Sequence, residues 1–200
     1  MNAILTHLCP ADYAVSRWSG GSTTQLAIAP EGAVYADRDF LWRLSSATVE
    51  LEESDFTPLP DYKRLISTLK GEIELVHDGG APLRLTPYQI HAFDGGAATC
   101  SRGVCTDFNL MLRKGACEGN LHAIELNAGQ AEFSACEAAR KARSATLLVY
   151  CGEGALTVEA GDECLNLTAG ESALVRDAVD VRLILRADGR ARCMAAEMWN

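Results

Sequence analysis

Polar side chains occupy alternate positions in two short apolar stretches of the chain, residues 40–49 and 107–112. Alternate side chains of an extended strand lie on the same face. If both stretches are strands, one face of each carries these residues: Arg43, Ser45, Asp107, Asn109 and Met111. Should the two faces converge, they would form a pocket that holds a guanidinium, a hydroxyl, a carboxylate and an amide, which are typical groups of a small-molecule site.

The chemistry of this set favours an anionic ligand. The planar guanidinium of Arg43 suits a carboxylate, and the amide of Asn109 can donate and accept at once. Asp107 would orient Arg43 or accept from a ligand N–H. Three further residues complete the predicted ligand site: Thr24 and Gln25 at the rim, after the Gly20–Gly21 turn, and Phe93 in the wall beside Met111. A second interpretation stays open, in which Arg43 and Asp107 form a buried ion pair that only fixes the packing.

The histidines do not form a recognisable metal motif. His7, His77, His91 and His122 lack the local spacing of zinc or iron ligands, although His77 and His91 could still meet across strands. We therefore expect no metal ligands and no cofactor. Eight cysteines occur without a Cys-x-x-Cys pair, which favours reduced thiols.

The elements that must position these residues are predicted to be β-strands. Apolar residues alternate with polar ones in short runs separated by Gly, Pro and Asp, which is typical of antiparallel sandwiches and barrels. The clearest runs cover residues 40–51, 63–69, 72–77, 83–86, 107–112, 146–150, 155–160, 163–167 and 181–185. Only Cys136–Arg143 has helical composition, and it is too short to be a stable helix alone. The fold class is all-β with little helix.

An internal repeat indicates two related halves. Residues 71–87 and 154–171 each contain a glycine, a strand, a Gly-bearing turn and a second strand, at nearly constant spacing. Each copy resembles the cupin half-motif, so the two copies resemble a bicupin with two antiparallel jelly-roll or β-barrel halves packed together. We expect a pocket-bearing half at residues 1–120 and a second half at residues 121–200, with possible exchange of strands between them.

Four local motifs together resemble the HutD/Ves family. They are Arg17–Gln25, Phe40–Val49, Asp55–Pro60 and Asp107–Met111, and Arg64 and the Leu69-x-Gly71 turn, which lie between the last two, belong to the same resemblance. The resemblance implies a bicupin without established catalysis. HutD proteins accompany histidine degradation and are proposed to bind a small metabolite of it, whereas Ves is associated with stress. Family members often have Asn where this chain has Gly20, so a ligand contact from that Asn is not carried over, while Thr24 matches.

Composition limits the class of partner. The 200 residues are 48% hydrophobic and carry a net charge of −9, which disfavours nucleic acid and anionic lipid. We expect no membrane partner and a cytoplasmic location, because the sequence shows neither a signal-peptide pattern nor a long apolar stretch. A homodimer is a possible assembly.

Three functions remain open at this level. The first is a non-enzymatic protein that binds a small carboxylate-bearing metabolite, such as an intermediate of histidine breakdown, as a sensor or accessory protein. The second is a metal-independent isomerase or lyase with Asp107 or His91 as general acid–base; Cys105 as nucleophile would lack an adjacent base. The third is an interaction protein with a closed, ion-paired core.

Overall fold

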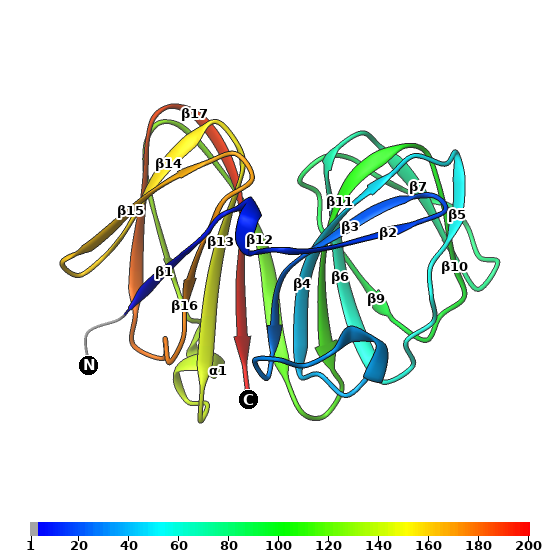
Figure 1. Ribbon diagram of the computed structural model, residues 1–200, viewed down its shortest axis with the longest axis horizontal. Coiled ribbons are helices and arrows are strands. Elements are labelled where there is room, and N and C mark those ends of the chain that lie inside the picture. The colour runs from blue at the N-terminus through cyan, green and yellow to red at the C-terminus, as the bar shows by residue number, and fades with distance from the viewer. Residues whose placement is uncertain (1–3) are drawn as a thin grey trace. The chain divides into compact units, whose positions relative to one another are not determined.

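The computed structural model describes residues 4–200, and its regular structure is almost entirely β-strand (Figure 1). This confirms the all-β fold class. The predicted helix is reduced to a single turn, α1 (Glu137–Arg140), as expected for a segment too short to be stable by itself. Two 3₁₀ turns, Pro10–Asp12 and Tyr35–Asp37, complete the helical part of the described residues. No helix within residues 4–200 is long and apolar enough to cross a membrane.

The chain divides into two compact units, and the first consists of residues 13–117. This unit contains a six-stranded and a four-stranded antiparallel sheet. In spatial order the larger sheet contains β2 (Ala14–Trp18), β3 (Gly21–Ala29), β4 (Trp42–Val49), β11 (Cys105–Arg113), β6 (Tyr62–Lys70) and β9 (His91–Asp94). The smaller contains β5 (Glu53–Asp55), β10 (Thr99–Arg102), β7 (Ile73–His77) and β8 (Leu83–Leu85). Apolar side chains of both sheets share one buried cluster, which includes Ile66 and Leu75.

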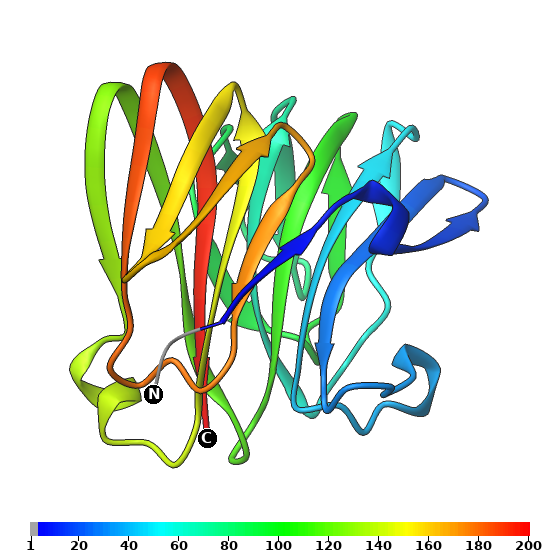
Figure 2. The same ribbon diagram turned by 60° about the vertical axis from the view of Figure 1, so that its left-hand side comes forward.

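The second unit combines residues 118–200 with the segment that ends at residue 12. Its seven strands are β1 (Leu5–Leu8), β16 (Ser172–Val175), β13 (Ala145–Glu153), β17 (Arg182–Trp199), β14 (Ala155–Ala160), β15 (Glu163–Thr168) and β12 (Glu118–Ser134). Figure 2 shows the long strands β12, in green, and β17, in red, side by side. The length of these two strands was not predicted, because in this part of the sequence only residues 181–185 alternate clearly.

The amino-terminal segment pairs with a strand of the second unit. β1 pairs with β16 in antiparallel register, and Leu5 lies in the core cluster of the second unit. The backbone hydrogen bonds and buried side chain of this strand therefore belong to the carboxyl-terminal unit, although the segment precedes the first unit in sequence.

The repeated segments adopt the same local structure. Gly71 precedes the β7–β8 hairpin with φ 76°, and Gly154 precedes the β14–β15 hairpin with φ 75°. A Cβ atom at Gly71 would lie 2.3 Å from the carbonyl oxygen of Val104, and one at Gly154 would lie 2.3 Å from that of Arg190. Both positions thus require glycine for the same two reasons, a left-handed conformation and a close backbone approach.

Candidate functional site

The site is built on three neighbouring strands of the six-stranded sheet. β11 lies between β4 and β6, so Met111 stands directly opposite Arg43 on one side and Arg64 on the other. Residues in register on neighbouring strands point to the same face, with strands about 4.8 Å apart. Two guanidinium-bearing side chains therefore flank one methionine on a single face of the sheet.

The next rows of this sheet face add polar groups. Asn109 stands opposite Ser45, and Asp107 stands opposite Ala47. These side chains line a pocket of about 380 Å³ within the first unit. Five residues of the predicted site line it: Arg43, Ser45, Asp107, Asn109 and Met111. The alternation of side chains along β4 and β11 therefore predicted correctly which polar groups of these strands share a face.

Thr24 and Phe93 were predicted to line the pocket, and neither does. In β3 the neighbouring residue Thr23 lines the pocket instead, because alternate side chains of a strand point to opposite faces. Phe93 lies beside Arg64, with its ring centroid 5.2 Å from the guanidinium carbon. It therefore supports an arginine of the pocket without forming part of the wall.

Arg43 is held by neutral groups. Its Nε donates to the Oε1 atom of Gln25 at 2.8 Å, and its Nη1 donates to the hydroxyl of Ser45 at 3.1 Å. The ring of Tyr35 lies 4.2 Å from its guanidinium carbon. Burial lowers the pKa of Arg43. Gln25, expected at the rim, thus positions Arg43 and is not itself a lining residue.

Arg64 is the site residue that the analysis of strand faces missed. Its Nη2 donates to the Oδ1 atom of Asn109 at 2.8 Å, and its buried Nε has no hydrogen-bond partner among residues 4–200. The guanidinium carbon lies 4.7 Å from the ring centroid of Phe56. Burial lowers the pKa of Arg64 from 12.5 to about 10. The signal in the sequence was a charged residue within the apolar run 63–69, at a position whose parity points inward.

Asp107 does not form the ion pair that the alternative interpretation required. Within residues 4–200 its carboxylate has no cationic partner at ion-pair distance, and its Oδ1 accepts from the amide of Ala47 at 2.9 Å. Burial raises its pKa to about 6, against the opposing effect of that hydrogen bond and of Asn109. The pocket lining carries three guanidiniums, those of Arg17, Arg43 and Arg64, and two carboxylates, those of Asp55 and Asp107. The pocket therefore has an excess of positive charge, which is larger when Asp107 is protonated.

The other candidate groups lie outside the pocket lining. Cys105 is buried, and desolvation raises its pKa to about 12, so it is not a poised nucleophile. His91 does not line the pocket and hydrogen-bonds to His77, which removes it as an acid–base group there. In the part of the chain that the structure describes, no cluster of three or more His, Cys, Asp or Glu side chains is arranged to hold a metal ion.

Comparison with known proteins assigns the chain to a family. The family model of HutD matches residues 10–195. The chain belongs to the HutD family. No curated protein matches it. This HutD-family chain is similar to a conserved protein of unknown function from Pseudomonas aeruginosa PAO1, with 25% identity, a TM-score of 0.85 and coverage of 98% of this chain and 100% of the other.

Two other solved structures agree in fold. HutD from Pseudomonas fluorescens SBW25 is 24% identical, with a TM-score of 0.76 and coverage of 98% of both chains. A cupin 2 conserved barrel domain protein from Leptotrichia buccalis is 8% identical, with a TM-score of 0.59 and coverage of 98% of this chain and 96% of the other. At these identities the similarity shows a cupin-like fold.

Proposed function

We propose that this HutD-family chain binds a small carboxylate-bearing metabolite in the pocket of its first unit and acts as a sensor or accessory protein. One observation carries the proposal. Arg43 and Arg64 flank Met111 on one sheet face, are only 5% and 6% exposed, and form no ion pair within the described residues.

The energetic argument concerns the unpartnered charge. A buried cation without an anionic partner is costly, often by several kcal/mol. Within residues 4–200, the hydrogen-bond partners of Arg43 and Arg64 are neutral and both guanidiniums lie beside aromatic rings, while Asp107 attracts them from beyond ion-pair distance. A bound carboxylate would supply the missing charge and could accept from the free Nε of Arg64.

The dimensions of the pocket favour a small ligand. Its volume of about 380 Å³ lies near the lower end of the range for small-molecule sites. Arg43 and Arg64 stand on strands separated by β11, so their Cα atoms are about 10 Å apart. Met111 between them offers an apolar surface for the body of the ligand. Asp107 could accept from a ligand N–H when ionised or donate when protonated.

Intermediates of histidine degradation meet these requirements. Urocanate, N-formiminoglutamate and N-formylglutamate each combine at least one carboxylate with a polar nitrogen. The pathway is suggested by the HutD family, and the carboxylate requirement comes from the arginines.

Calorimetric titration with these three acids tests the proposal. We expect at least one to bind wild-type protein, with affinity about 10- to 100-fold weaker in Arg43→Met and in Arg64→Met. Arg84→Met is the matched control, because Arg84 is exposed and paired with Glu72 away from the pocket. Absence of binding by every acid, or equal affinity in all variants, would reject the proposal.

A second candidate function is favoured by the pKa of Asp107. A carboxyl group with a pKa of about 6 inside a ligand pocket is suited to general acid–base chemistry near neutral pH. The chain would then be a metal-independent isomerase or lyase. Proton NMR of each bound acid over time distinguishes the two functions: turnover that Asp107→Asn abolishes without loss of binding supports catalysis, and an unchanged spectrum supports binding alone.

A further inference from the structure

A pair of histidines outside the anion pocket has an arrangement that the proposed function does not use. His77 ends β7 and His91 begins β9, and their Nε2 atoms lie 3.0 Å apart. The ring centroids are 5.1 Å apart with planes inclined by 25°. Because the centroids are much farther apart than the two nitrogens, the rings meet edge to edge and their Nε2 atoms point toward each other.

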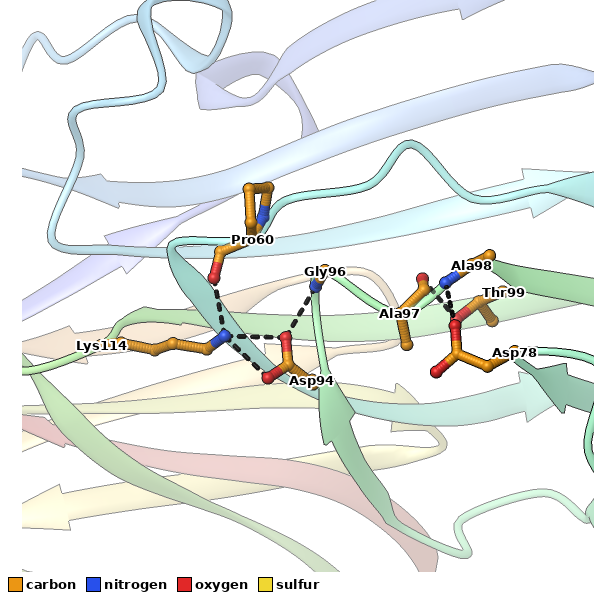
Figure 3. Close-up of polar contacts among 8 residues, drawn as sticks. All are labelled: Pro60, Asp78, Asp94, Gly96, Ala97, Ala98, Thr99 and Lys114. Carbon is orange, nitrogen blue, oxygen red and sulfur yellow. Dashed lines mark hydrogen bonds and ion pairs between the residues drawn. The ribbon is translucent and has the colours of Figure 1, made fainter.

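Thr99 determines how His77 presents its nitrogens. The hydroxyl of Thr99 donates to the carbonyl of Ala97 at 3.2 Å, a contact drawn in Figure 3. Its oxygen is therefore available to accept from Nδ1 of His77, which lies 2.8 Å away. This places the proton of neutral His77 on Nδ1 and directs the Nε2 lone pair at His91. Metal-binding histidines are commonly oriented by such a hydrogen bond from the other ring nitrogen.

The surroundings hold both rings in place. The ring of Phe93 lies 4.7 Å from that of His77 and 5.9 Å from that of His91. The segment between β9 and β10 is fixed by Asp78, whose Oδ1 accepts from the amide of Ala98 at 2.9 Å, as Figure 3 shows. Both histidines are half-buried, so solvent and ions reach them.

We propose that His77 and His91 form a two-histidine site for a borderline transition-metal dication, such as Ni²⁺, with water in the remaining positions. Two metal–nitrogen bonds of about 2.0–2.1 Å place the nitrogens about 2.9 Å apart at a right angle, the geometry that suits Ni²⁺, and about 3.3 Å apart at a tetrahedral angle. The observed 3.0 Å lies within this range, so metal binding requires mainly that the two rings turn until both Nε2 lone pairs point at the metal. His91 keeps its proton by moving it from Nε2 to Nδ1, and neutral imidazole is a good ligand for these metals.

The charges around the pair are compatible with a dication. The negative charge of Asp78 attracts a cation at His77, whereas the positive charge of Arg64 repels it. The site is separate from the anion pocket, whose lining includes neither histidine.

Calorimetric titration of the full chain with Ni²⁺ tests the site. We expect one equivalent to bind wild-type protein, and no detectable binding to His77→Gln or His91→Gln. Thr99→Val should weaken binding about 10- to 100-fold, because it removes only the orienting hydrogen bond. His7→Gln is the control, since His7 lies in the other unit near Glu171. Circular dichroism verifies that each variant is folded.

Nitrogen-detected NMR of the imidazoles gives a second readout that does not depend on a substitution. Ni²⁺ should selectively broaden or shift the ring signals of His77 and His91 in wild-type protein. Lack of binding would show a hydrogen-bonded histidine pair only and would overturn the proposal. Binding that persists in both glutamine variants would locate the metal elsewhere, for example at exposed Cys164, and would also overturn it. Arg64→Met separates the two proposals, because it should weaken acid binding, whereas Ni²⁺ binding should stay intact or become tighter once the repelling charge of Arg64 is removed.

Discussion

Replacing Arg64 by methionine should change stability and ligand affinity in opposite directions. Arg64 is 6% exposed, and burial lowers its pKa from 12.5 to about 10. This difference corresponds to about 3 kcal/mol of destabilisation of the folded protein at neutral pH, where the side chain remains charged. The hydrogen bond to Asn109 offsets about 1.5 kcal/mol of that cost. The free energy of unfolding of Arg64→Met should therefore rise by about 1–2 kcal/mol.

The same substitution, Arg64→Met, should weaken ligand binding. A hydrogen bond from a guanidinium to a carboxylate contributes about 1.5–3 kcal/mol, so the variant should bind the acid about 10- to 100-fold more weakly. Urea unfolding at neutral pH gives the first quantity and calorimetry gives the second. In the control Arg84→Met, neither stability nor affinity should change measurably, because Arg84 is exposed.

The combination of results distinguishes a ligand-binding arginine from a structural one. If Arg64→Met unfolds more easily than wild type by more than about 1 kcal/mol and still binds the acid normally, Arg64 serves the packing of the sheet and the reasoning is refuted. Arg64→Lys adds a further test, because it retains the charge but loses the planar donor geometry. It should bind more weakly than wild type without the gain in stability.

Three further predictions concern other buried groups. Because burial raises the pKa of Asp107 to about 6, ionisation of this group destabilises the folded protein above that pH. The free energy of unfolding, measured in urea, should therefore increase as pH falls from about 6 toward 4. Asp107→Asn should remove this pH dependence. Glu197 is buried, which acts to raise its pKa, but hydrogen bonds from His122, Asn120 and Cys136 lower the pKa to about 2. The contribution of Glu197 to stability should be lost as pH falls from about 4.5 to 2, and Glu197→Gln should cost about 1–3 kcal/mol by urea unfolding at pH 7. Gly71→Ala and Gly154→Ala should each lower the thermal midpoint more than Gly161→Ala, because all three glycines have positive φ but an added Cβ at Gly161 would contact nothing.

Local pattern was sufficient to predict which side chains share a strand face. Alternation along residues 40–49 and 107–112 depends only on the extended backbone, so it placed Arg43 with Ser45 and Asp107 with Asn109. The sequence also predicted the glycines at the start of the two hairpins, Gly71 and Gly154. Positive φ and a close backbone approach both disfavour a side chain at these positions. The motifs for the HutD family lay in the same local segments.

Register and long-range pairing could not be predicted locally. β11 enters the sheet between β4 and β6, far from either in sequence, and only this pairing brings Arg64 beside Met111 and Arg43. An irregularity of register between Gln25 and Ala27 lies where β3 meets β4, and Gln25 hydrogen-bonds to Arg43 there.

The sequence by itself determined the all-β class, the repeated hairpins and the faces of the strands, because these depend on neighbouring residues. The tertiary structure decided which faces meet. It joined β1 to the carboxyl-terminal unit, kept the Asp107 carboxylate beyond ion-pair distance of Arg43, and brought His77 and His91 together from different strands. The physical reason is that charge pairing and burial depend on distances between segments remote in sequence, which alternation along one strand does not encode.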